Sequence, residues 1–561
     1  MNRGASKSRS PWAIPALALG GLGLALAAWM LPINALSLPP ALLQAAGEDT
    51  RTTADLGQAM LDGEKLGPAA LVLHALEEIN DAPTRGQLDL ADDLSRFAAR
   101  QPELVPWGGW DPFLDPLFNR QENRGRTEST PVLRFFVTGE ARRALAGFLD
   151  GTRSAGVRAL LGLREVDRTV QFVPAGRPGG QALDAVILMA ALLYQGEHFS
   201  DSLQRELRRM AEAAGDGGDL TDIEPFFLDL LSLGQRLDWI QLTELTRLVD
   251  SPETLHEYAH LSRVATSDLA VIYAAALASD SADQVAAYVI RFGRSGLEDL
   301  SFALQCGQGA VRQLLARQVP VNRDAGPTLG AVASLGILHP RLLLGVKYAG
   351  LLIGAFLFFR GVDRWLAERT IAGGGLPHLS SGVLAILTAA VIIVATEPFL
   401  LRAAPPSEFQ LTFAVPVLAD ISDTTSAELT ETTTAMDTST LLSIGLFASL
   451  QVAVYLICLF KIGSIDKMDL SPLVKLRLME NEENLFDSGL YVGIGGTAAA
   501  LVMQVLGVIE PNLLAAYSSN LFGITCVALV KIRHVRPYKY KLIMAGQAAI
   551  DAGQVVPAAV R

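Results

Sequence analysis

The chain has 561 residues, of which 50% are apolar, with a mean hydropathy of +0.32 and a formal net charge of -12 at pH 7. So apolar a composition is typical of a membrane protein, and the acidic balance excludes nucleic acid as a partner because no basic face is available to displace phosphate counterions. A disulfide framework is also excluded, since only Cys306 could face an oxidising compartment while Cys458 and Cys526 lie in apolar runs near basic flanks.

The first apolar run covers residues 11–34 and follows the basic residues Arg3, Lys7 and Arg9. It is long enough to cross a hydrocarbon core of about 30 Å. A cleaved signal peptide is the alternative, but the run is long for one and no clean A-x-A cleavage site follows it. We therefore expect residues 1–40 to form a cytoplasmic tail and an uncleaved transmembrane anchor.

Residues 41–340 show the leucine and alanine periodicity of amphipathic helices, as in LGPAALVLHALEEI, with few alternating β-branched runs. Between residues 90 and 180 this periodicity weakens. There WGGWDPFLDPLF and VQFVPAGRPGG are typical of loops, and TPVLRFFVTG is compatible with a strand. We expect a mostly helical, exported domain that binds other envelope proteins.

Serines that could cap helices recur at steps of roughly 14 to 16 residues in the last part of this domain, at Ser251, Ser267, Ser281 and Ser295. The last two have Gln or Glu three residues later, as in a capping box. This spacing predicts helices of about three turns that stack as antiparallel pairs, as in helical-repeat proteins.

The segment HEYAH places His256, Glu257 and His260 in the H-E-x-x-H order of zinc peptidases, in which two imidazoles hold the metal and the glutamate activates water. Helical spacing predicts instead that both histidines lie on a polar flank beside Arg263, whose fixed charge opposes a metal ion. A third protein ligand is not evident nearby. We expect a solvated helix face and no metal cofactor, and the alternative is a membrane-anchored zinc hydrolase with Glu257 as its catalytic residue.

Five further apolar runs predict transmembrane helices, at about residues 342–360, 381–401, 440–460, 489–508 and 512–530. Threaded alternately, the runs put the basic loops and both tails on one side, which the positive-inside rule makes cytoplasmic. The other side receives the exported domain and the acidic loop 403–439, which contains no Lys or Arg. The predicted fold is therefore all-α: a polytopic protein of the bacterial inner membrane with about six transmembrane helices, cytoplasmic termini and a periplasmic domain.

Two ionisable residues lie inside the second and third runs, in the region 341–402. Lys347 and Glu397 sit at similar depths near the outer ends of their runs. Ionisable groups at this depth are costly unless they are paired or reach the interface, so we expect the two to face each other. The alternative is that each side chain reaches the interface independently.

The last three runs, in the region 440–561, contain polar residues near mid-membrane but no charge. A glycine series at Gly489, Gly493 and Gly496 is typical of close helix packing, and the polar groups could serve as hydrogen bonds between helices. The other interpretation is a polar stripe that lines an ion path, with the candidates Thr497, Gln504, Ser518, Ser519 and Asn520.

The segments GLYVGIGGTAAALVMQVLGV and LLAAYSSNLFGITCVAL resemble the glycine-rich helix and the small-residue helix of the MotA/TolQ/ExbB proton-channel family, the stator subunits of ion-driven envelope motors. On this resemblance Thr497 corresponds to the threonine of the first motif, Ser519 and Asn520 to a Thr-Thr pair, and Gly523 to the closing glycine. The chain departs from the family where Asn replaces the second threonine and where the region between the first two helices is reduced to residues 461–488.

The resemblance implies a homo-oligomer, a pentamer, that encloses a separate single-span membrane partner whose aspartate accepts the proton. It further implies a proton-conducting, stator-like subunit coupled to the exported domain. The alternative is a membrane scaffold without transport activity, in which every polar group is structural.

Overall fold

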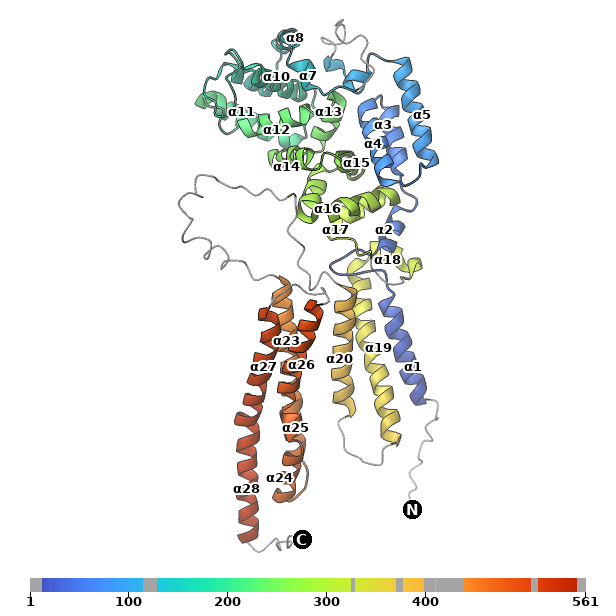
Figure 1. Ribbon diagram of the computed structural model, residues 1–561, viewed down its shortest axis with the longest axis vertical. Coiled ribbons are helices and arrows are strands. Elements are labelled where there is room, and N and C mark those ends of the chain that lie inside the picture. Colours follow the sequence, from blue (N-terminus) through green and yellow to red (C-terminus); the bar gives the residue numbers. More distant parts are fainter. Residues whose placement is uncertain are drawn as a thin grey trace. The chain divides into compact units, whose positions relative to one another are not determined.

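The computed structural model describes residues 13–114, 129–323, 328–369, 377–397, 409, 438–505 and 513–551, and the chain divides into two compact units. Every regular element in these ranges is a helix (Figure 1). Within the described ranges, extended backbone pairs at two isolated bridges, Leu38 with Val321 and Arg168 with Asp219. The all-α prediction is confirmed.

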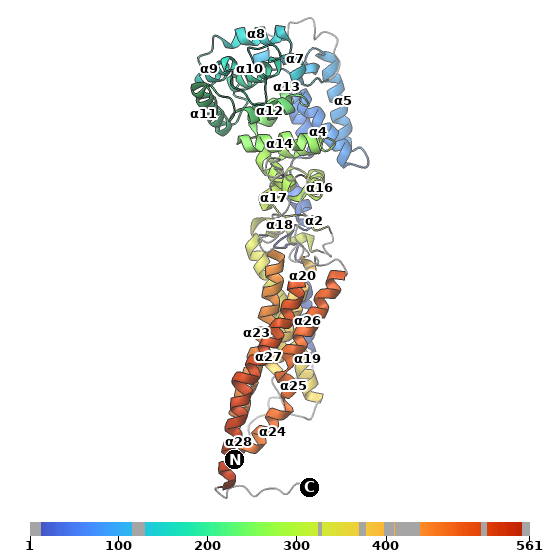
Figure 2. The same cartoon turned by 60° about the vertical axis from the view of Figure 1, so that its left-hand side comes forward.

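The helical unit comprises residues 37–340 together with 405–412. One continuous hydrophobic core joins its helices, and successive helices such as α3 and α4, or α15, α16 and α17, pack against each other. The longest wholly buried stretch is in α10, which α7, α8, α9 and α12 surround (Figure 2). The helices are α2 (Pro40–Gly47), α3 (Thr53–Asp62), α4 (Leu66–Ile79), α5 (Arg85–Arg100), α7 (Leu133–Phe136), α8 (Gly139–Leu149), α9 (Ala155–Gly162), α10 (Gln181–Gln195), α11 (Asp201–Gly217), α12 (Glu224–Gly234), α13 (Trp239–Arg247), α14 (Pro252–Val264), α15 (Leu269–Ser279), α16 (Ala282–Cys306), α17 (Gln308–Arg317) and α18 (Ala333–Leu338).

Two of the four predicted serine caps are confirmed. The Ser251 hydroxyl accepts from the backbone N–H of Thr254 at 3.2 Å, and the Ser281 hydroxyl accepts from that of Gln284 at 3.3 Å. Each bond satisfies an N–H that has no partner within its own helix, so α14 and α16 begin where the sequence indicates.

The other two serine caps are wrong. Asp268 precedes α15, and the Ser267 hydroxyl donates to its carboxylate instead. Ser295 lies inside α16, shortly after a break at Gly293, whose φ of 59° interrupts the helix. The break replaces the loop that the spacing predicts, because glycine adopts a positive φ without steric cost.

The stretch TPVLRFFVTG, whose composition is compatible with a strand, instead forms the short helix α7 at its centre. Burial overrides the β-propensity of this aromatic stretch: Phe136 is fully buried against Trp239, and Phe135 stacks on Trp107 with ring centroids 4.0 Å apart. The loops predicted on either side of it are confirmed where the structure describes them, as short 3-10 turns and irregular backbone.

The apolar unit comprises residues 1–36, 341–404 and 413–561. All six predicted apolar runs contain helices, and two of the described helices, at Pro340–Val362 and Phe447–Asp466, are long and apolar enough to cross a membrane. The helices are α1 (Ala13–Trp29), α19 (Pro340–Arg369), α20 (Pro377–Thr396), α23 (Thr438–Asp466), α24 (Pro472–Asn481), α25 (Glu483–Phe486), α26 (Ser488–Val505), α27 (Leu513–Leu529), the π-helical η7 (Val530–Val535) and α28 (Arg536–Asp551). The last three form one long continuous helix (Figures 1 and 2).

Small residues bring α1 and α19 into backbone contact. A Cβ added to Gly21 would lie 2.5 Å from the backbone nitrogen of Phe358, and one added to Gly354 would lie 2.6 Å from that of Ala25. Such close approach through small residues is the usual way in which transmembrane helices pack. α1 is therefore an integral part of this helix group.

Candidate functional site

Lys347 of α19 is buried, with 2% of its surface exposed, and all three of its donors find acceptors. Its ammonium donates to the carbonyl oxygens of Leu31 (3.2 Å) and Ile33 (2.6 Å) and to the side-chain oxygen of Asn34 (2.7 Å). These acceptors follow the last turn of α1, where helix carbonyls lack partners of their own and a cation is electrostatically favoured.

Glu397 directly follows α20 and is fully buried. Its carboxylate accepts from the backbone N–H of Ala35 and Leu36, the latter at 3.1 Å, and from the hydroxyl of Tyr348 at 2.9 Å. Hydrogen bonds from neutral donors to a carboxylate are stronger than those between neutral groups, so the charge is well compensated.

Together Lys347, Tyr348 and Glu397 hold residues 31–36, and we call this arrangement the 31–36 clamp. Both residues of the expected pair thus bind the same short segment. Lys347 binds oxygen acceptors of residues 31–34, and Glu397 binds the backbone N–H groups of residues 35 and 36. Among the described residues, no ion pair within 4 Å joins the two side chains directly. A buried charged group needs such hydrogen bonds, because transferring the group from water to the protein interior costs several kcal/mol.

Glycines also bring α26 and α27 together. A Cβ on Gly493 would lie 2.9 Å from the carbonyl oxygen of Ser519, and one on Gly523 would lie 2.6 Å from that of Gly489. The Ser519 hydroxyl of α27 donates across this seam to the Gly493 carbonyl of α26 (3.2 Å). The Gln451 amide of α23 donates to the Gly489 carbonyl (3.1 Å) and so joins a third helix to α26. The geometry is that of interhelical hydrogen bonds and close packing.

The remaining ion-path candidates differ in how they are placed. Thr497 donates to the Gly493 carbonyl of its own helix at 3.1 Å, and Ser518 lies one position before the seam residue Ser519. Two amide oxygens, Oδ1 of Asn520 and Oε1 of Gln451, are buried without a hydrogen-bond partner. The Gln504 side chain lies outside the described residues.

The HEYAH segment lies on α14 with the predicted orientation. Its apolar neighbours Leu255, Tyr258, Ala259 and Leu261 are fully buried, whereas His256 and His260 are only partly buried. His256 Nδ1 lies 2.9 Å from a carboxylate oxygen of Asp229 in α12. Burial, followed by the charges of Arg263 and His256, lowers the pKa of His260, and burial raises the pKa of Glu257. Within the described part of the chain, no three His, Cys, Asp or Glu side chains come together to hold a metal.

The helical unit also contains a buried polar network that its sequence did not predict. Asp111 accepts from the Trp239 indole at 2.7 Å and lies 2.8 Å from Nε2 of His198. Because the Arg247 guanidinium only donates, its 2.9 Å contact makes His198 Nδ1 an acceptor. Burial raises the pKa of Asp111, but the adjacent His198 imidazole and the hydrogen bond from Trp239 outweigh this effect, so that the pKa of Asp111 is lowered. The network joins α13 to loops that are distant in sequence.

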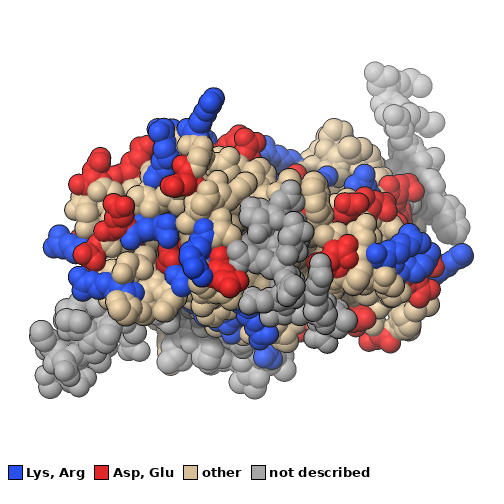
Figure 3. All heavy atoms as spheres, turned by 90° about the horizontal axis from the view of Figure 1, so that it is seen from above, with Lys and Arg blue, Asp and Glu red and all other residues tan. Residues whose placement is uncertain are grey.

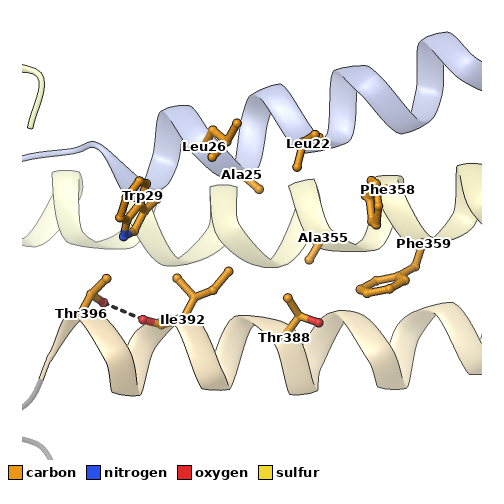
Figure 4. Close-up of a pocket in the computed structure, with 10 residues that line it drawn as sticks. All are labelled: Leu22, Ala25, Leu26, Trp29, Ala355, Phe358, Phe359, Thr388, Ile392 and Thr396. Carbon is orange, nitrogen blue, oxygen red and sulfur yellow. Dashed lines mark hydrogen bonds between the residues drawn. The ribbon is translucent and has the colours of Figure 1, made fainter. Parts of the chain in front are cut away.

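An apolar groove of about 360 Å³ lies between α1, α19 and α20 (Figure 4). The hydroxyl of Thr396, at one end of the groove, donates to the Ile392 carbonyl of its own helix at 2.9 Å. Apart from its threonines, the groove is lined by apolar side chains and the Trp29 ring. Such a lining suits an acyl chain and offers no charge to orient a polar substrate.

Acidic and basic side chains are interspersed over the face of the molecule in Figure 3, and neither sign forms a continuous patch there. Comparison of the chain with protein-family models, with curated proteins and with solved structures finds no match. The resemblance to the MotA/TolQ/ExbB family therefore stays a prediction from sequence.

Proposed function

We propose that the protein is a membrane-anchored scaffold of a bacterial inner membrane, which presents its helical unit to protein partners in the envelope. The observation that carries this proposal is the 31–36 clamp. Lys347 and Glu397, the ionisable residues predicted inside the second and third membrane runs, are committed to holding the segment through which the chain leaves α1. In this proposal the two side chains fix residues 31–36, the segment that connects α1 to the helical unit.

The helical unit supports the partner-binding half of the proposal. It consists of stacked short helices on one continuous core, as in helical-repeat proteins that bind other proteins over extended surfaces. Trp110 beside the turn Gly108–Gly109 is half exposed, and aromatic residues of this kind are enriched where proteins meet.

The membrane arrangement that accompanies the proposal has six spans, with both termini in the cytoplasm and residues 37–340 in the periplasm. It is supported by the helical state of all six runs and by the distribution of Lys and Arg between the loops. Retention of α1 as an uncleaved anchor is supported by its backbone contact with α19.

A second candidate, proton conduction by the C-terminal helices, has one specific observation in its favour. The buried oxygens of Asn520 and Gln451 lack hydrogen-bond donors, and such acceptors would stabilise a protonated carboxyl of a membrane partner. Substitution separates the two candidates: Thr497→Val or Asn520→Leu abolishes the function of a conductor without affecting assembly, whereas a scaffold keeps its function with either change.

The experiment that tests the scaffold is co-purification of envelope proteins with the full-length chain from native membranes. A matched variant carries Trp110→Ser, which removes an exposed aromatic ring without touching the core. We expect partner recovery to fall with this variant while the amount of protein in the membrane is unchanged. Recovery of the chain alone, in wild type and variant equally, would contradict the proposal.

A further inference from the structure

A second cavity, of about 400 Å³, lies where η7 joins α28, beside α25. Its lining combines three cations, Lys531, Arg536 and Lys539, with apolar side chains that include Ile532 and Ile543. Several of these residues belong to the π-helical segment η7, a rare conformation that frequently marks functional sites. The cavity is therefore amphipathic, in contrast to the apolar groove between α1, α19 and α20.

Two of the three cations are available to a ligand. The Lys531 ammonium is already bound to the Asp487 carboxylate at 2.7 Å. Arg536 and Lys539 are three residues apart on α28, hence on one face, and neither forms an ion pair among the described residues. The one acidic residue in the lining is Glu483, so the available charges carry a net excess of one positive charge.

The apolar part of the cavity is accessible from outside. Ile532 and Ile543 are 67% and 50% exposed, which is unfavourable in water but not in contact with lipid tails. The cavity also lies at the level where an apolar helix ends: the Tyr538 hydroxyl of α28 donates to the carboxylate of Asp466, the last residue of α23, at 3.0 Å. Cations and aromatic rings at this level are typical of the boundary between hydrocarbon and headgroups.

We propose that this cavity binds an anionic phospholipid, with its phosphodiester between Arg536 and Lys539 and an acyl chain along Ile532 and Ile543. The inference rests on the membrane placement in the proposed function. Charge complementarity selects an anionic headgroup over a zwitterionic one, and the adjoining apolar side chains select a lipid over a free anion. The site lies on the face that the basic loops assign to the cytoplasm, where anionic lipids act on juxtamembrane cations.

The test is native mass spectrometry of the full-length protein in detergent, equilibrated with equal amounts of phosphatidylglycerol and phosphatidylcholine. The variant R536Q/K539Q removes the two available cations. Its matched control, R533Q/K541Q, removes the same charge from exposed positions of the same helix that do not line the cavity. We expect the wild type and the control to retain phosphatidylglycerol preferentially and R536Q/K539Q to lose roughly tenfold or more of that preference.

Equal losses in the two variants, or no preference in the wild type, would overturn the proposal. Displacement of the lipid by glycerol phosphate at matched concentration would also overturn it, because the site would then bind a free anion. Alkaline extraction of native membranes distinguishes failure of the lipid-site proposal from failure of the proposed membrane function. Release of the chain from the membrane defeats the membrane placement itself, whereas a retained chain without lipid preference defeats only the site.

Discussion

At the residue scale, the molecule satisfies a buried cation and a buried carboxylate with backbone groups instead of joining them to each other. Lys347 and Glu397 take opposite halves of residues 31–36, so each charge compensates polar groups that would otherwise be stranded. Removing one side chain leaves those groups buried without partners, which costs more than the net value of the bonds themselves.

We predict that Lys347→Met lowers the free energy of unfolding by about 3 kcal/mol or more and that Glu397→Gln, which keeps its shape and one acceptor, costs less. Because both side chains hold one segment, the double variant should lose less than the sum of the two single losses. Thermal and denaturant unfolding of the detergent-solubilised protein measures all three. Additive losses, to within about 0.5 kcal/mol, would show that the two contacts are independent.

Stability should depend on pH through buried carboxyls of the helical unit. Burial raises the pKa of Asp238 to about 7 and that of Asp299 to about 6, from 3.8. Between about pH 4 and 7 these two carboxyls therefore bind more protons in the folded state than in the unfolded state, so the stability that they contribute is fully present below pH 4 and is lost as the pH rises. Asp238→Asn should flatten this decline in a thermal-unfolding series, although His260, whose lowered pKa acts in the opposite direction, stays in place. An unchanged slope in the variant would contradict the assignment to Asp238.

At the scale of elements, two glycine seams hold the apolar helices together, one between α1 and α19 and one between α26 and α27. One helix of each seam also carries a glycine with open space around it, Gly345 in α19 and Gly495 in α26. These exposed glycines are internal controls, because alanine there adds helix propensity without a clash.

We predict that Gly354→Ala and Gly493→Ala each destabilise the protein by roughly 1–3 kcal/mol, since the new Cβ would meet backbone at 2.6 and 2.9 Å. Gly345→Ala and Gly495→Ala should be neutral or stabilising by up to about 1 kcal/mol. Unfolding in detergent compares the members of each pair. A seam variant as stable as its control would mean that the helices do not pack as described.

Local signals in the sequence predicted some helix starts correctly and others wrongly: the serine caps hold at Ser251 and Ser281 but not at Ser267 and Ser295. The buried face of α14 and the starts of α14 and α16 follow from periodicity and from serine caps. The sequence did not predict α7, where long-range burial overrides β-propensity. It could not find Asp229 opposite His256 or Asp111 opposite His198, because neither pairing leaves a signal in local spacing. The 31–36 clamp was anticipated only in its charged residues; its backbone partners are set by the fold.

At the scale of the whole molecule, the chain leaves the apolar unit after residue 36 and returns to it at residue 341. The two units are therefore linked at both ends of the helical unit, and under the proposed topology both links lie on the periplasmic side. We predict that protease added to spheroplasts cleaves within residues 37–340 but leaves residues 461–488 intact until the membrane is permeabilised. Protection of the helical unit in intact spheroplasts would contradict this topology and place residues 37–340 in the cytoplasm.

The most direct test of the scaffold proposal is the mass and composition of the complex gently extracted from native membranes. The scaffold predicts a complex in which the chain is accompanied by envelope proteins. A ring of about five copies around a single-span, aspartate-bearing partner would contradict it and make proton conduction the function of the C-terminal helices.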